Sequence, residues 1–207
     1  MVDGVSSKLI ERVVDHFAAL PGIGRKTALR FALHLLNKEK SDIQAFADAL
    51  VQMRETIQYC ESCHNISDQK LCSICSSTSR KKELICVVQD IRDVIAIENT
   101  HSHPGIYHVL GGVISPMDGV GPNDLNIASL IAKVQTGEID EVIFALPVTM
   151  EGDTTNFYIY RQLEKFNITV TTLARGVSVG EEIEYTDQLT LGKSIQNRTL
   201  FSQTLKS

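Results

Sequence analysis

Residues 20–30 read LPGIGRKTALR, a Pro/Gly turn that leads directly into a basic, helix-prone segment. Glycine permits the positive φ values that a tight hairpin needs, and at Gly22 and Gly24 no side chain blocks approach to the backbone. A helix that starts after Gly24 would have free N–H groups in its first turn, and its dipole adds to their attraction for an anion. The sequence therefore predicts a phosphate-binding hairpin at Gly22 and Gly24.

Basic side chains follow the hairpin. Lys26 and Arg30 are four residues apart, so they share one helix face, and Arg25 precedes them. No side chain in this stretch is placed to read base edges, so we expect Arg25, Lys26 and Arg30 to bind DNA with little sequence preference. The alternative is an ordinary packing corner with solvated basic side chains. The pattern resembles the helix–hairpin–helix motif of DNA-repair proteins, which favours DNA binding.

Three helices are predicted around the hairpin. The first covers residues 8–19, the second starts just after Gly24, and the third runs from Ser41, which with Gln44 resembles a capping box, to about Gln58. Apolar residues recur at helical spacing in all three. We expect the following side chains to form the inward faces: Leu9, Ile10, Val13, Val14, Phe17 and Leu20; Ala28, Phe31, Ala32 and Leu35; Ile43, Phe46, Ala47, Leu50 and Ile57.

Four of the five cysteines form two CxxC pairs, Cys60 with Cys63 and Cys72 with Cys75, separated by eight residues. Each pair offers two thiolates, and the short connector lets both pairs face one tetrahedral Zn²⁺. Four thiolates leave no open position, so the predicted site is structural. Free thiols or adventitious disulfides are the alternative, and the neighbouring His64 could compete as a ligand. The fifth cysteine, Cys86, lies in an apolar run and is expected to be a buried hydrophobe.

Composition and charge limit the function. The chain has 207 residues, 43% of them hydrophobic and 22% charged, which is typical of a globular protein of one or two modules. The first residues, MVDGVSSKLIERVV, do not resemble a signal peptide, and we expect a cytoplasmic protein. The net charge of −5 is uneven: residues 20–36 carry three cations and no acid, whereas residues 83–153 carry eleven acids against Arg92 and Lys133. DNA contact is therefore expected mainly through the N-terminal part.

Strands and helices alternate after residue 82. Short apolar strands are predicted at 84–88, 107–110, 141–146 and 168–173, with helices at 90–98, 124–135 and 154–166 between them. This alternation predicts a parallel sheet covered by helices. The tail from Arg175 has glycine turns and short β-prone stretches.

Acidic residues follow two of these strands. Asp90 comes after the first strand, and Glu151 and Asp153 come after the third. Carboxylates at the carboxyl ends of parallel strands can hold Mg²⁺, as a nuclease or topoisomerase requires. The alternative is a helix N-cap cluster, in which the acids favour the positive end of the helix. A strand-cutting topoisomerase needs a nucleophilic tyrosine near the acids, and Tyr158 and Tyr160 lie a helix turn or two past Asp153, where packing is the simpler explanation.

Nearly the whole chain resembles the RecR family of bacterial recombination mediators. The resemblance runs through LPGIGRKTALR, CESCHNISDQKLCSIC, ICVVQDIRDVIAIENT, GGVISPMDGVGP, TMEGDTTNFYI and ARGVSVGEEIEY. It implies an α/β multidomain protein: a helix–hairpin–helix DNA-binding domain (1–58), a four-cysteine zinc motif (59–82), a Toprim-type parallel α/β domain (83–174) and a small β-containing C-terminal oligomerisation segment (175–207).

The resemblance also implies a role without chemistry. RecR-like proteins form ring-shaped homo-oligomers, commonly tetramers, and act with RecO and RecF to load RecA on single-stranded DNA. Lys26 and Arg30 match the DNA-binding positions of the hairpin, and Glu151, with Asp153 beside it, matches the acidic motif used toward RecO. Gly176 and Gly180 match a C-terminal motif involved in subunit packing.

The chain departs from the family pattern at two positions. Gln89 replaces the usual Glu after the first strand of the α/β domain, and Gln cannot supply the anionic charge that a catalytic metal needs there. Ser178 replaces a usual proline. We therefore expect a DNA-binding mediator, with a Mg²⁺-dependent nuclease or topoisomerase-like enzyme as the alternative function.

Overall fold

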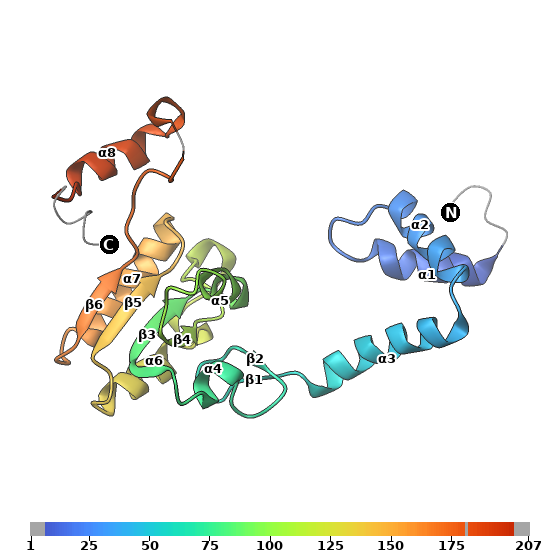
Figure 1. The fold of residues 1–207 in the computed structure, drawn as a ribbon, viewed down its shortest axis with the longest axis horizontal. Coiled ribbons are helices and arrows are strands. Elements are labelled where there is room, and N and C mark those ends of the chain that lie inside the picture. The colour runs from blue at the N-terminus through green and yellow to red at the C-terminus, as the bar shows by residue number, and fades with distance from the viewer. Residues whose placement is uncertain (1–6, 181, 201–207) are drawn as a thin grey trace. The chain divides into compact units, whose positions relative to one another are not determined.

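In the computed structural model, which describes residues 7–180 and 182–200, the chain forms two units, Met1–Ile57 and Gln58–Ser207 (Figure 1). The first unit contains the predicted hairpin. The second unit contains the cysteine segment, the α/β domain and the tail.

Two helices pack against each other in the first unit. α1 (Lys8–Ala18) is capped by Ser7, whose hydroxyl accepts a hydrogen bond from the Ile10 N–H, and α2 (Arg25–Leu36) follows the hairpin. Val14, Ala28 and Ala32 are buried between the two helices. The small alanine side chains let the helices approach closely. The Phe17 and Phe31 rings meet edge to face.

The third helix differs from its prediction. α3 (Lys40–Thr56) starts at Glu39 as N-cap, with no capping side chain, so the predicted capping box of Ser41 and Gln44 is wrong. Ser41 lies inside the helix, and the Gln44 amide donates to Asp48 instead. No residue of α3 is buried, and its expected inward face stays open, with Phe46 45% and Leu50 50% exposed. Within the described part of the first unit, residues 7–57, nothing covers this face.

The sheet confirms the predicted parallel α/β architecture. Its strands are β3 (Lys81–Val88), β4 (Gly105–Val109), β5 (Glu141–Ala145) and β6 (Thr169–Thr172), in the order β4-β3-β5-β6 and all parallel. In the register of the sheet, Val88 pairs with both Val109 and Ala145. The carboxyl ends of the three strands therefore lie together.

Helices cover both faces of the sheet. Successive side chains of β3 point to opposite faces, so Ile85 and Val87 join one core while Cys86 and Val88 join the other. α6 (Ile127–Gln135) and α7 (Met150–Leu163) cover the first face, and α5 (Ile91–Glu98) covers the second. Cys86 is 2% exposed, as expected for a buried hydrophobe. Burial on both faces explains why the strands read as apolar runs.

The remaining elements are short. The cysteine segment has β1 (Gln58–Tyr59) antiparallel to β2 (Ile66–Ser67), followed by α4 (Ser73–Ser76), and the loops carry η1 (Pro116–Asp118) and η2 (Pro122–Asp124). The predicted β content of the tail is wrong where the structure describes it, because residues 175–180 and 182–200 contain no strand and instead carry η3 (Ile183–Tyr185) and α8 (Gln188–Gln196), which is capped by Asp187. Residues 181 and 201–207 of the predicted tail lie outside the described residues.

An ion pair with shared hydrogen bonds ties the start of β3 to α5. Arg80 pairs with Glu98 and also donates to the His103 carbonyl at 2.9 Å, while the Tyr107 hydroxyl donates to Glu98 at 2.7 Å. Burial raises the pKa of Glu98, but the hydrogen bonds from Arg80 and Tyr107 outweigh it and hold the pKa below its usual value. The carboxylate form of Glu98 therefore contributes to stability.

Glu98→Gln is expected to lower the free energy of unfolding at pH 7 by about 1–3 kcal/mol, since it removes the charge that two donors share. Because the folded-state pKa is depressed, this contribution is present above the unfolded pKa of about 4.3 and is lost as pH falls through the folded value. Urea unfolding at several pH values measures it. Glu61→Gln, at the exposed Glu61–Lys70 pair, is the matched control and should change little. Equal effects of the two variants at pH 7 would contradict the prediction.

Candidate nucleic-acid interface and metal centre

The hairpin presents its backbone to solvent. Gly22 has φ of +78°, which side-chain-bearing residues rarely adopt, and the Ile23 N–H closes the turn on the Leu20 carbonyl at 3.2 Å. Gly24 is the N-cap of α2 and offers no side-chain cap. A Cβ placed at Gly22 or Gly24 would meet nothing within 4 Å. The first N–H groups of α2 therefore lie beside open space, as an anion site requires.

The three cations near the hairpin differ in their surroundings. Lys26 and Arg30 are exposed, line one shallow hollow of about 330 Å³, and form no ion pair within the described residues. Arg25 instead pairs with Asp15 of α1 at 2.8 Å. This pair, ten residues apart in sequence, was not predicted, and it partly neutralises one of the three expected DNA contacts.

The four cysteines form a closed cluster. Cys60, Cys63, Cys72 and Cys75 are buried, and their sulfur atoms all lie within 4.8 Å of one another. The backbone N–H of Cys72 points to the Cys60 sulfur at 3.3 Å, which favours thiolate ligands. The hydrogen bond between Cys63 and Cys75 lowers the pKa of Cys75 and raises that of Cys63, so the two thiols share one proton unequally. Four buried sulfur ligands with no open position fit a structural zinc ion.

The chain makes a tight turn at His64, directly after the first cysteine pair. His64 has φ of +61°, and its N–H donates to the Cys60 carbonyl at 2.9 Å. Its Nε2 lies 2.8 Å from the Ser129 hydroxyl of α6, and the group of potential ligand atoms that lie close together contains the four sulfur atoms without His64. His64 therefore does not compete as a zinc ligand in this arrangement.

The cysteine segment packs on the α/β domain. The Val109 N–H donates to the Cys63 carbonyl at 2.8 Å, so the segment continues the hydrogen bonding at the end of β4. The His108 Nε2–H donates to the Asn126 carbonyl at 2.8 Å, and burial lowers the pKa of His108 to about 3. A neutral histidine is thus fixed at the junction, with its ring 5.2 Å from that of His64.

The acidic residues lie where parallel sheets place ligands. Gln89 and Asp90 follow β3, Glu151 and Asp153 follow β5, and these adjacent strands flank the point where strand order reverses. Glu151 and Asp153 were expected on a turn before a helix beginning near residue 154. They lie instead in the first turn of α7, which begins at Met150, because Thr149 caps the helix by accepting from the Gly152 N–H.

Two of these carboxylates already have cationic partners. Asp90 caps α5 and pairs with Arg92, and Asp153 pairs with Arg175; in each case the hydrogen bond from the arginine lowers the pKa of the carboxyl group. Glu151 is exposed. Within residues 7–180 and 182–200, the only group of three or more potential ligands close enough for a metal ion is the cysteine cluster.

Gly152 is required by its surroundings. A Cβ there would lie 2.0 Å from the Pro147 carbonyl oxygen, so the loop after β5 touches the helix backbone directly. This contact fixes the first turn of α7, which carries Glu151 and Asp153, against the end of β5.

Comparison with known proteins agrees with this architecture. Residues 10–54 match the family model described as RecR, helix-hairpin-helix, and residues 57–77 match the four-cysteine zinc finger domain of RecR. Residues 83–174 match the Toprim domain, and residues 176–199 match the RecR C-terminal family. The chain thus combines a helix–hairpin–helix module, a four-cysteine zinc finger and a Toprim domain.

Curated relatives match the chain over nearly its full length. The chain is 57% identical over 202 residues, 98% of each chain, to Recombination protein RecR of Flavobacterium johnsoniae. It is 56% identical over 206 residues, 100% of each chain, to the protein of that name from Porphyromonas gingivalis, and 56% over 199 residues, 96% of this chain and 97% of the relative, to that of Bacteroides fragilis. The chain belongs to the RecR family of recombination proteins. None of its described helices is both long and apolar enough to cross a membrane.

Proposed function

We propose that this protein is a DNA-binding recombination mediator that performs no chemistry. In this proposal it acts in the cytoplasm with RecO and RecF to help load RecA on single-stranded DNA. The observation that carries DNA binding is the open hairpin, with Gly22 and Gly24 beside the exposed Lys26 and Arg30. Phosphate contacts of this kind bind single- and double-stranded DNA with little sequence preference.

Each segment of the chain has a separate role in this proposal. Residues 1–58 bind DNA, residues 59–82 hold zinc, residues 83–174 bind a partner, and residues 175–207 contribute to oligomerisation. Exposed apolar side chains of α8, such as Leu189 (79% exposed) and Ile195 (59%), support the last assignment.

The surroundings of the Toprim acids favour partner binding over catalysis. Gln89 brings no negative charge, and the carboxylates of Asp90 and Asp153 are paired with Arg92 and Arg175. Glu151 remains exposed at the positive end of α7, where a basic patch of a partner can reach it. A Mg²⁺-dependent nuclease or topoisomerase-like enzyme is the competing function.

Glu151→Lys is expected to weaken RecO capture by about tenfold or more, because it places like charge opposite a basic patch. Folding, zinc content and DNA binding should stay near those of the parent protein. Pull-down or calorimetric titration with RecO measures the effect, and Glu164→Lys, also at an exposed position of the same domain, serves as the control. Unchanged RecO binding in Glu151→Lys would remove the partner role from this residue.

We also propose that the protein acts as a homo-oligomer, a dimer or a tetrameric ring. One hairpin offers few cationic contacts, and each is screened at cellular salt. Several hairpins on one assembly raise avidity through effective concentration without new contacts. The Lys26 and Arg30 sites would then act together on one DNA molecule.

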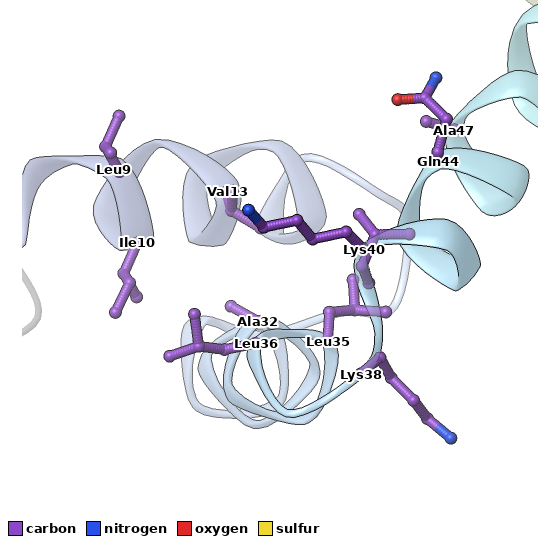
Figure 2. Close-up of a pocket in the computed structure, with 11 residues that line it drawn as sticks. Leu9, Ile10, Val13, Ala32, Leu35, Leu36, Lys38, Lys40, Gln44 and Ala47 are labelled. Carbon is purple, nitrogen blue, oxygen red and sulfur yellow. The ribbon is translucent and has the colours of Figure 1, made fainter.

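An apolar groove in the first unit supports this oligomer (Figure 2). It has a volume of about 690 Å³ and is lined mainly by apolar residues of α1, α2 and α3, of which Leu9 is 72% and Leu36 67% exposed, with Lys38, Lys40 and Gln44 at one end. Figure 2 shows Leu9, Ile10 and Val13 on α1 across from Ala32, Leu35 and Leu36 on α2. A second copy that covered this groove and the open face of α3 would bury side chains that the single chain leaves in water.

The double variant Leu9→Glu with Val13→Glu is expected to form smaller species and to lose DNA affinity, although Lys26 and Arg30 remain intact. Two charges in the groove oppose burial against another subunit. Light scattering during a DNA titration measures both effects, and Met117→Glu, at a 96% exposed apolar residue outside the groove, is the control. A parent protein that is monomeric at micromolar concentration, yet binds DNA tightly at physiological salt, would contradict the oligomer.

A further inference from the structure

A lysine of the Toprim domain lies at the junction with the zinc segment. Lys133 is in the last turn of α6, four residues after Ser129 and therefore on the same helix face. The Ser129 hydroxyl forms a hydrogen bond with the His64 ring, and His64 directly follows the zinc ligand Cys63. The face of α6 that carries Lys133 is thus the face against which the zinc segment packs.

The Lys133 ammonium group is buried there without a hydrogen-bond partner. Its Nζ is inaccessible to solvent and has no acceptor within the described residues. A buried charge that lacks a partner is strongly unfavourable, and a lysine side chain is long enough to reach water elsewhere on a helix surface. The position therefore needs a compensating negative charge.

The cysteine cluster is the source of that charge. Burial holds the pKa of Lys133 below its ordinary value, and the nearby Cys75, Cys63, Cys60 and Cys72, when they are thiolates, offset part of that lowering. His64 and His108, which also lie at this junction, supply no anion, because an imidazole ring is neutral or cationic. A Zn²⁺ ion with four thiolates carries a net charge of about −2, which such an ammonium group offsets in part.

We propose that Lys133 is a positioning residue for the zinc centre: its ammonium group balances the charge of the zinc–thiolate cluster across the junction. The Toprim domain then forms part of the outer surroundings of the metal. Zinc retention and the packing of the segment on α6 support each other, because each loses a charge partner when the other is lost.

The first test compares zinc release from full-length variants into excess chelator, followed with a colorimetric zinc indicator. Lys133→Met keeps the length and apolar stem of the side chain but removes the charge, and should release zinc about tenfold faster or more. Lys133→Arg keeps the charge and should stay close to the parent. Lys82→Met, at an exposed lysine near the start of β3, is the control and should match the parent. Parent-like zinc release from Lys133→Met would overturn the proposal.

A second measurement separates charge balance from simple packing. Melting temperatures of the parent and Lys133→Met are compared with zinc bound and after zinc has been stripped. Charge balance predicts that Lys133→Met lowers the melting temperature of the zinc-loaded protein but leaves the stripped protein unchanged or raises its value, since an unpaired buried charge has been removed. An equal decrease in both states would show a packing role only and would also overturn the proposal.

Discussion

Cys72→Ser should abolish zinc binding and unfold the segment around the cluster. The substitution tests the loss of a metal ligand separately from the loss of a helix cap. Cys72 is the N-cap of α4 and its sulfur accepts a hydrogen bond from the Cys75 N–H, and a serine hydroxyl can replace the sulfur in that role. What is lost is one of four thiolate ligands. Structural zinc contributes about 10–16 kcal/mol in small zinc-finger peptides, so the loss should be large.

The segment has little else to hold it together. Among the described residues, its buried cluster consists of the four cysteines, with only Ile74 packed against them. A segment of this size without a larger apolar core depends on its metal for folding. Its unfolding would also remove the hydrogen bond from Val109 to Cys63 at the end of β4.

Elemental analysis and thermal unfolding measure the effect of Cys72→Ser, which should show little zinc and a lower melting temperature or aggregation. Cys86→Ala is the matched control, because Cys86 is buried in β3 outside the cluster and its loss should leave zinc content intact. Parent protein that contains no metal when purified without chelator would contradict the zinc assignment.

Lys26→Ala combined with Arg30→Ala should remove most of the DNA affinity. These side chains flank the open hairpin, and neither has an acidic partner within the described residues. Each lost phosphate contact lowers the slope of log affinity against log salt by about 1, so the double variant should lose about 2 for every hairpin that engages DNA. The loss should be similar for single- and double-stranded DNA of different sequences.

Fluorescence anisotropy titrations at several salt concentrations test this prediction. Lys81→Ala with Lys82→Ala makes the same change in net charge at exposed positions of β3 and is the control. Arg25→Ala should have a smaller effect than either hairpin substitution, since Asp15 already pairs with Arg25. An unchanged salt slope in Lys26→Ala with Arg30→Ala would place the DNA site elsewhere.

The sequence predicted the parts of the fold that depend on local pattern. Apolar runs of strand length, separated by helical segments, predicted the parallel sheet, and burial of β3 on both faces explains why that pattern was clear. The paired CxxC spacing predicted the metal cluster, because the ligands of each pair are close in sequence. The turn at Gly22 and Gly24 and the basic helix that follows it were predicted for the same reason, since their residues are adjacent in sequence.

Features set by contacts distant in sequence could not be predicted. The Arg175–Asp153 pair spans 22 residues and the His64–Ser129 contact spans 65, so no local pattern indicates them. The apolar residues of α3 recur at ordinary helical spacing. That spacing predicts an apolar helix face, but it does not predict whether the same chain or another subunit buries the face. The tail forms α8 despite its β-prone composition, because Asp187 caps a helix there.

The central claim is that the protein binds DNA through its hairpins and leaves the DNA chemically unchanged. The most direct measurement incubates supercoiled plasmid with the parent protein and Mg²⁺, and divides each sample between a native gel and a gel run after the protein has been removed. We expect retarded plasmid in the first gel and fully supercoiled plasmid in the second. Nicked or relaxed plasmid that appears with the parent protein but not with Glu151→Ala would contradict it.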